Sequence, residues 1–380
     1  MPELIDAPET LSRALTHLST ARTLAVDTES DSFHAYRPKV CLIQVSAEGR
    51  DLLFDPLSGI DLGGLGGLLA DPAREIVLHA AENDVILLHH QFGWRIARLF
   101  DTQVACFVLG EKPYSLAGIL EARFGVRLDK SQQRSDWARR PLEPRQLAYA
   151  AEDTRHLVAL AAELKARVSA AGRTEEIESE CARIAAREWT PEPFDPEGFW
   201  SIHGARDLDG TGARILRDLY LFRHGEADRR NWAPFRIVGD ATLVSIARDR
   251  IVRGQRGVPE SFWRRYGERV AGVVRAAVER GALPRPERRR ERGTPLAPEV
   301  KRRFEALRRW RSAAAARRGV ESFVVARNEM LAQVAALGAH SPDDLAAIVE
   351  PWRLREYGAA MIAAMLDGRG DRGDNGPSEK

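Results

Sequence analysis

The stretch "LAVDTESDSF", residues 24–33, places two carboxylates where an apolar strand runs toward a core. Successive side chains of an extended strand alternate between its two faces, so we expect Asp27 and Glu29 to share one face. Two like charges held side by side are costly unless water, protons or a cation relieve the repulsion. The stretch therefore predicts either the solvated end of a strand or one part of a metal site.

The segments on either side of these acids predict a mixed α/β domain. Two further strand-like runs, "KVCLIQVS" (39–46) and "DLLFDP" (51–56), follow "TLAVDTES" (23–30) after turn-sized connections. Such short connections favour antiparallel pairing of the three strands. Strand-like and helix-like runs then alternate, beginning with "EIVLHA" (75–80) and "ENDVILLHHQFG" (82–93), which indicates helices packed on a mixed sheet.

The bulk composition is that of a chain with packed cores and a basic second part. The 380 residues are 44% hydrophobic, and the three cysteines match no zinc-ligand spacing, so we expect buried thiols. We find no run of about 18 apolar residues and no apolar leader, and therefore expect a cytoplasmic protein without a membrane partner. Residues 1–170 hold 19 Lys and Arg against 23 Asp and Glu, and the remainder holds 38 against 32. This asymmetry is consistent with a polyanionic partner for the second part.

Proline-rich stretches divide the second part of the chain. They are "REWTPEPFDPEGFW" (187–200) and "LPRPERRRERGTPLAPEV" (283–300), and they suggest linkers between domains. The expected domains are 1–186, 187–284 and 285–367, the last two being small and all-helical. A polar, glycine-rich tail at 368–380 is expected to be disordered.

The two helical segments repeat one another. Five residues of the first recur in the second at identical spacing: Leu219, Arg229, Arg230, Phe235 and Leu243 correspond to Leu307, Arg317, Arg318, Phe323 and Leu331. The pattern predicts a duplicated helical module.

Three further polar residues occur at positions that are suited to a site. Asp84 falls in the opening turns of a predicted helix, and Tyr149 and Asp153 lie four residues apart on one face of another. Each has an ordinary alternative: a charge at a helix start, a core ring, or a surface acid.

Taken together, "DTE" (27–29), "HAAEND" (79–84) and "YAAED" (149–153) resemble the three exonuclease motifs of the DEDD superfamily, in its tyrosine-bearing branch. The longer runs 26–46, 100–105 and 128–154 resemble ribonuclease D, and the repeated module resembles its HRDC domains. The first module matches well; the second matches loosely and has lost charge, reading "REYGAAM" where the first reads "RRYGERV". The resemblance implies a ribonuclease H-like exonuclease domain followed by two HRDC-type domains.

The resemblance also implies a 3′ to 5′ exoribonuclease that uses two divalent metal ions, Mg²⁺ or Mn²⁺. Asp27 would bridge both ions, Glu29 and Asp153 would complete one site, and Asp84 would serve the other directly or through water. Tyr149 would orient the attacking water, because a phenol with an ordinary pKa near 10 is a poor base. The implied partner is the 3′ end of RNA, such as tRNA precursors, with no obligate protein partner evident.

Candidate substrate contacts are less distinctive. In the first domain they are Thr28, Lys39, Gln44, His79, Lys130, Arg134, Trp137 and Arg140, and in the first helical module Arg229, Arg230, Trp232 and Arg236. Basic residues and aromatic rings can grip phosphates and stack on bases, but a solvated loop anchored by one tryptophan gives the same pattern.

Two other functions share this sequence pattern. A DNA 3′ to 5′ exonuclease would carry the same acids, since nothing in the sequence visibly reads a 2′-hydroxyl. A non-catalytic RNA-binding scaffold is the second alternative, although a scaffold would normally have lost one of the acids.

Overall fold

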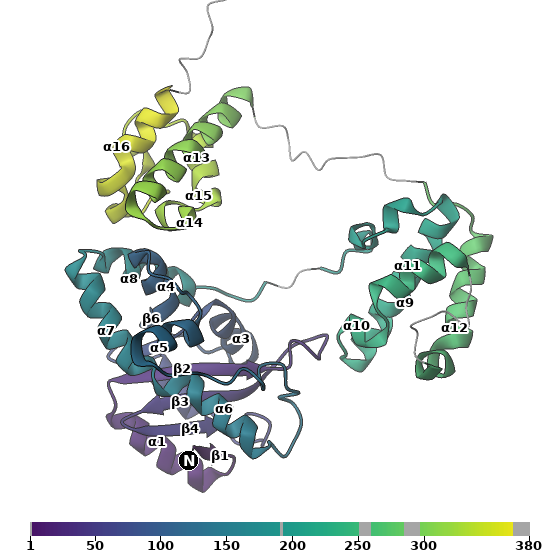
Figure 1. Cartoon of the computed structure of the whole chain (residues 1–380), viewed down its shortest axis with the longest axis horizontal. Coiled ribbons are helices and arrows are strands. Elements are labelled where there is room, and N and C mark those ends of the chain that lie inside the picture. Colours follow the sequence, from purple (N-terminus) through teal and green to yellow (C-terminus); the bar gives the residue numbers. More distant parts are fainter. Residues whose placement is uncertain (1, 191–192, 251–259, 285–296, 368–380) are drawn as a thin grey trace, which may run out of the picture.

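The computed structural model describes residues 2–190, 193–250, 260–284 and 297–367. It contains an N-terminal α/β domain and two helical modules (Figure 1), which confirms the predicted fold class. The tail and most of the second proline-rich stretch lie outside the described residues, so their predicted roles stay predictions, as do the domain boundaries.

One mixed six-stranded sheet forms the centre of the N-terminal domain, in the order β1-β4-β3-β2-β5-β6. The predicted antiparallel pairing of β2 with β3 and of β3 with β4 is present, while β1 runs parallel to β4, and β5 runs parallel to both β2 and β6. The strands are β1 (Glu3–Ile5), β2 (Thr23–Ser30), β3 (Val40–Ala47), β4 (Arg50–Phe54), β5 (Glu75–Leu78) and β6 (Leu99–Asp101).

Strand β2 extends beyond the end of its partner β5. The unpaired edge of β2 that results carries the acids. The pairing of the two strands covers only Thr23–Ala25 of β2, because β5 ends and the chain turns into helix α3. Beyond Ala25, β2 keeps only its pairing with β3. Crevices of this kind, outside the carboxyl ends of parallel strands, are the usual ligand sites of open α/β sheets.

Helices surround the sheet, and α6 lies over β2, β3 and β4. The buried apolar residues of strands and helices form one main core, to which the cysteines Cys106 and Cys181 belong. All three cysteines are free and buried, as predicted. The helices of this domain are α1 (Pro8–Thr20), α2 (Gly63–Leu69), α3 (Glu82–Phe92), α4 (Thr102–Leu109), α5 (Leu116–Phe124), α6 (Pro144–Arg155), α7 (Leu157–Ala170) and α8 (Thr174–Ala185).

The first helical module has its own core of buried apolar side chains, which is centred on the long helix α9. Its elements are the 3₁₀ turns η1 (Gly198–Ser201) and η2 (Ala205–Asp207), and the helices α9 (Gly210–Arg230), α10 (Pro234–Ile237), α11 (Asp240–Asp249) and α12 (Glu260–Glu279). The second module comprises α13 (Pro298–Arg318), α14 (Ser322–Val325), α15 (Asn328–Leu337), η3 (Asp343–Leu345) and α16 (Pro351–Asp367), around a separate core.

A buried arginine makes the same contacts in both modules. Arg223 of α9 donates to the carbonyl of Val238 (3.1 Å) and to Asp240 (2.6 Å). At the same spacing, Arg311 of α13 donates to the carbonyl of Ala326 (3.0 Å) and to the side chain of Asn328 (2.9 Å). The shared contacts agree with the duplication that the sequence predicts.

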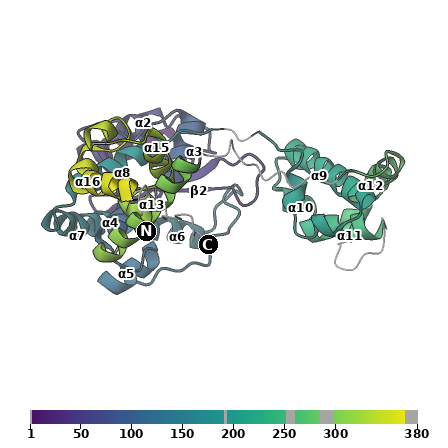
Figure 2. The ribbon, with the colours of Figure 1, turned by 90° about the horizontal axis from the view of Figure 1, so that it is seen from above.

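The two modules contact the N-terminal domain at different places (Figure 2). The second module lies against α8, where Arg318 pairs with Glu176 (2.7 Å) and Arg327 with Glu180 (2.6 Å). The first module meets the loop between β2 and β3, which extends toward α10 (Figure 1). In the described part of the chain, we find no helix with the length and apolar character that crossing a membrane requires.

Candidate active site

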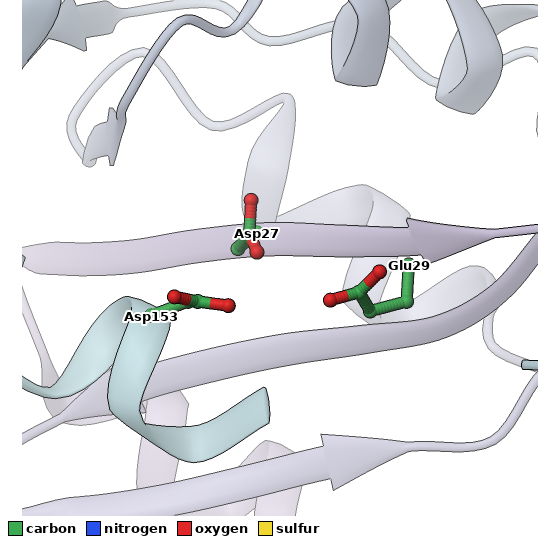
Figure 3. Close-up of side chains that lie close together, drawn as sticks. All are labelled: Asp27, Glu29 and Asp153. Atoms are coloured by element: carbon green, nitrogen blue, oxygen red, sulfur yellow. The ribbon is translucent and has the colours of Figure 1, made fainter. Parts of the chain in front are cut away.

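Three of the four predicted acids meet in one cluster. Asp27 and Glu29 come from β2 and Asp153 from α6, and one carboxylate oxygen from each lies within 4.8 Å of the others. Figure 3 shows the three carboxylates pointing toward a common space between strand and helix. Strand alternation and the placement of α6 over β2 together explain the convergence.

Helix α6 is fixed to the sheet beside the cluster. Ser46 of β3 and Thr154 of α6 share a buried hydrogen bond of 2.7 Å. One residue before Thr154, Asp153 accepts a hydrogen bond from the hydroxyl of Tyr149, which lies one helical turn away on the same face. Helix α6 therefore brings the phenol and the acid of the third motif to the site together.

The fourth acid, Asp84, reaches the site from the first turn of α3. It accepts a hydrogen bond from the hydroxyl of Thr28, and its charge is the largest electrostatic contribution to the raised pKa of Asp27. Asp84 thus neighbours the cluster without belonging to the group of three. Thr28, which the sequence analysis places among substrate contacts, instead holds an acid in position.

A residue that the sequence analysis did not single out supports Asp84. Asp101, buried at the end of β6, accepts hydrogen bonds from the backbone of Ala80 (3.1 Å) and Ala81 (2.8 Å), where the chain enters α3. Ala80 has a φ of 60°, an uncommon conformation for a residue with a side chain. Asp101 also caps α4. The motif "FDT" contains the signal, since an acid followed by Thr after a strand is typical of a helix cap.

Burial raises the pKa values of all four acids, and the charges of the other acids raise those of Asp27 and Glu29 further. Burial, then the charges of Asp84, Asp153 and Glu29, raise the pKa of Asp27 well above its usual value. Burial and the charges of Asp153 and Asp84 raise the pKa of Glu29 to about 9. Burial raises the pKa of Asp84 and that of Asp153 to about 6. The apo cluster therefore retains protons that a cation would displace.

The donor set fits a hard divalent cation. Mg²⁺ and Mn²⁺ prefer carboxylate oxygens, and this half-buried cluster presents three of them close enough to share one ion. Burial and the charges of Asp153, Glu29 and Asp27 also raise the pKa of the Tyr149 hydroxyl. The phenol is therefore a neutral hydrogen-bonding group at every working pH.

Two predicted substrate contacts are enclosed by the fold. Gln44 lies directly opposite Asp27 in the β2–β3 pairing and is fully buried, so RNA cannot touch it directly. His79 makes a hydrogen bond of 2.9 Å between its Nδ1 and the hydroxyl of Thr102 at the start of α4. That contact ties His79, which follows β5, to the start of α4.

Two residues of the 130–141 segment are structural, which contradicts their expected substrate contacts and agrees with the alternative of a loop anchored by one tryptophan. Trp137 is 1% exposed and packs in a small core with Leu42 and Leu53, so its ring cannot stack on a base. Arg140 pairs with the buried Asp55 through contacts of 2.6 and 2.7 Å. By contrast, the side chains of Lys39, Lys130 and Arg134 are exposed and open to phosphates.

Three of the four residues proposed in the first module form a cation–aromatic cluster. The guanidinium groups of Arg230 and Arg236 lie over the Trp232 ring at 5.5 and 5.4 Å, while Arg229 pairs with Glu226. Trp232 and Arg236 line a groove of about 840 Å³. These side chains remain available to a polyanion, although Arg229 has a protein partner.

Comparison with known proteins agrees with this geometry. The family model for a 3'-5' exonuclease matches residues 2–169, and the HRDC domain model matches residues 213–274 and 300–365. The ribonuclease D of Gluconacetobacter diazotrophicus is 31% identical over 97% of this chain and 93% of its own length. That of Nitrobacter hamburgensis is 28% identical over 95% and 94%.

Solved structures share the fold over almost the whole chain. Escherichia coli RNase D, described as an exoribonuclease involved in structured RNA processing, aligns with a TM-score of 0.62 at 24% identity, covering 97% of this chain and 99% of that one. A protein from Bifidobacterium adolescentis aligns with a TM-score of 0.77 at 20% identity, covering 96% and 97%. The resemblance seen in the motifs is thus confirmed, and this chain belongs to the ribonuclease D family.

Proposed function

We propose that this chain is a divalent-metal-dependent 3′ to 5′ exoribonuclease that trims structured RNA, such as tRNA precursors, and releases nucleoside 5′-monophosphates. The observation that carries the proposal is the convergence of Asp27, Glu29 and Asp153, with Asp84 beside them, in the domain that matches the exonuclease family. We expect this activity to occur in the cytoplasm and to need no obligate protein partner.

The acids are the groups that would hold the metal. We assign Asp27 to both of two ions, Glu29 and Asp153 to one, and Asp84 to the other. Two divalent ions held by these acids would supply an activated water and would offset charge on the entering and leaving oxygens of a phosphodiester. Tyr149, held by its hydrogen bond to Asp153, orients the water for in-line attack.

The 3′ to 5′ direction of attack is taken from the family resemblance, and the surroundings of the site suit a chain end. The cluster lies in the second half of β2, beside α3 and α6, and the loop that follows β2 contacts the first helical module. A chain end fits such a bounded site, and the rest of the strand continues toward the basic module. We propose that the exposed Arg and Lys side chains there hold the RNA body through its phosphates.

The discriminating experiment compares RNA and DNA of one sequence, labelled at the 5′ end, as competing substrates in Mg²⁺. We expect stepwise shortening of the RNA from its 3′ end with release of monophosphates, and slower degradation of the DNA. Equal rates on both strands would overturn the RNA assignment in favour of a DNA exonuclease. Binding without any shortening would favour the scaffold alternative.

A further inference from the structure

Two exposed phenylalanines touch each other across the boundary between two domains. Phe33 follows β2 in the N-terminal domain, Phe235 lies in α10 of the first helical module, and their ring centroids are 5.3 Å apart. Despite this contact, Phe33 is 50% exposed and Phe235 is 53% exposed. Rings that served only to join two domains would be buried by the contact, so these two keep large apolar faces open to solvent.

Cationic side chains adjoin both rings. The guanidinium of Arg134 lies 5.8 Å from the centroid of the Phe33 ring. Phe235 is one of the residues that line the groove of about 840 Å³, together with Trp232, Arg236, Arg264 and Arg265. Half-exposed aromatic rings among arginines are complementary to single-stranded nucleic acid, because bases stack on the rings while guanidinium groups meet phosphates.

The loop that carries Phe33 is held in place beside the acids. Phe33 is four residues beyond Glu29, so the two Cα atoms are at most about 14 Å apart. The backbone N–H of Ala233 donates to the carbonyl of His34 (2.9 Å), and the N–H of Arg37 donates to Asn231 (2.7 Å). The pair of rings is therefore a fixed feature between the acids and the groove.

We propose that Phe33 and Phe235 form a stacking platform for bases of single-stranded RNA immediately upstream of the nucleotide that is removed. This inference rests on the proposed function and extends it, since it names where the last unpaired bases lie. Arg134 and the arginines of the groove take the adjoining phosphates. Stacking tolerates every base, which suits an enzyme that must advance one nucleotide at a time through any sequence.

The direct test measures binding without turnover. Anisotropy of a labelled single-stranded oligonucleotide, long enough to span from the acids to the groove, gives Kd in Ca²⁺ for the wild type, Phe33→Ala and Phe235→Ala. Each variant should bind about five- to a hundredfold more weakly, the range expected for one lost stacked base. Phe124→Ala is the matched control, because Phe124 is 40% exposed on α5 and should leave Kd unchanged. Phe33→Trp should keep the Kd of the wild type, whereas Phe33→Leu should weaken binding as Phe33→Ala does.

A second measurement separates this inference from the proposed function. In Mg²⁺, the ratio of kcat/KM on the long oligonucleotide to kcat/KM on a dinucleotide should fall in Phe33→Ala and Phe235→Ala, because only the long strand reaches the platform. Unchanged Kd and an unchanged ratio in both folded variants would overturn the platform. Wild-type protein that binds RNA through the platform but hydrolyses neither substrate would instead contradict the proposed function alone. Tight binding of an unrelated acidic peptide, lost in both variants, would identify a protein-docking surface and also overturn the inference.

Discussion

At the scale of single residues, the site is a set of acids that the fold holds against their own repulsion. Strand alternation predicted that Asp27 and Glu29 share a face, and helical spacing predicted the pairing of Tyr149 with Asp153; these local periods are legible in a sequence. The structural roles of Trp137 and Arg140 could not be predicted in this way. Burial of the indole and the pairing of Arg140 with Asp55 depend on residues distant along the chain.

The raised pKa values predict how the metal-free protein responds to pH. The pKa of Glu29 rises from 4.5 to about 9 on folding, so the folded protein keeps a proton that the unfolded chain releases. Stability from this group is therefore present below pH 4.5 and is lost as pH rises toward 9. We expect Tm of the EDTA-treated wild type to fall across this range and that of Glu29→Gln to fall less. Parallel Tm curves would contradict the burial of Glu29 in the cluster.

Tyr149 should act as a neutral hydrogen-bonding group and not as a titrating base. The substitution Tyr149→Phe removes only the hydroxyl that bonds Asp153, and we expect kcat to fall about 10²-fold, a typical loss for one positioned hydrogen bond. Mn²⁺ affinity should be preserved. Since burial raises the pKa of the phenol, the alkaline limb of the kcat profile should be the same in both proteins. Loss of that limb in the variant would show that Tyr149 titrates.

At the scale of elements, the site depends on how β5 gives way to α3. The early end of β5 leaves an edge of β2 open, and Asp101 fixes the turn that brings Asp84 to it. The sequence indicated the strands and helices on either side of this turn. It did not reveal that an acid from β6 secures the turn, because that contact joins neighbouring strands of a parallel pair.

Removal of Asp101 should therefore damage both stability and catalysis. For Asp101→Ala we expect the free energy of unfolding to fall by about 2–4 kcal/mol, from one lost helix cap and buried N–H groups left without acceptors. Displacement of Asp84 should lower kcat about 10²-fold as well. Asp209→Ala, which removes the cap of α9 in the first module, is the control: it should lower stability by about 1 kcal/mol without changing kcat. Equal kcat in both variants would contradict a positioning role for Asp101.

In the whole molecule, the two copies of the duplicated module make different contacts. Arg318 and Phe323 of the second module pack on Glu176 and Phe107 of the N-terminal domain. Their counterparts in the first module, Arg230 and Phe235, are beside the basic groove, and Phe235 also touches Phe33 of the N-terminal domain. The repeat itself was evident from residue spacing, and the loss of charge in the second copy suggested unequal roles. The surface that each copy contacts could not be predicted from the sequence, because both copies share the same local pattern.

The docking of the second module should depend on its buried ion pair. Arg318→Met keeps the bulk of the side chain but leaves Glu176, which is 2% exposed, without its main partner. Breaking a buried pair in this way costs about 3–5 kcal/mol. We expect faster hydrogen exchange in α8 and α14 and a larger radius of gyration in solution. Arg317→Met, at the exposed neighbouring position, should change neither measurement. Identical behaviour of the two variants would show that the pair does not anchor the module.

We infer that the four acids together bind a pair of divalent ions. Calorimetric titration of Mn²⁺ into the protein saturated with a nucleoside 5′-monophosphate tests it most directly, alongside the Asp27→Asn variant. We expect two bound ions per wild-type chain. In Asp27→Asn we expect the loss of at least one ion and of all RNA hydrolysis, while RNA binding in Ca²⁺ persists. Two ions bound with unaltered affinity by Asp27→Asn, or undiminished hydrolysis by that variant, would contradict it.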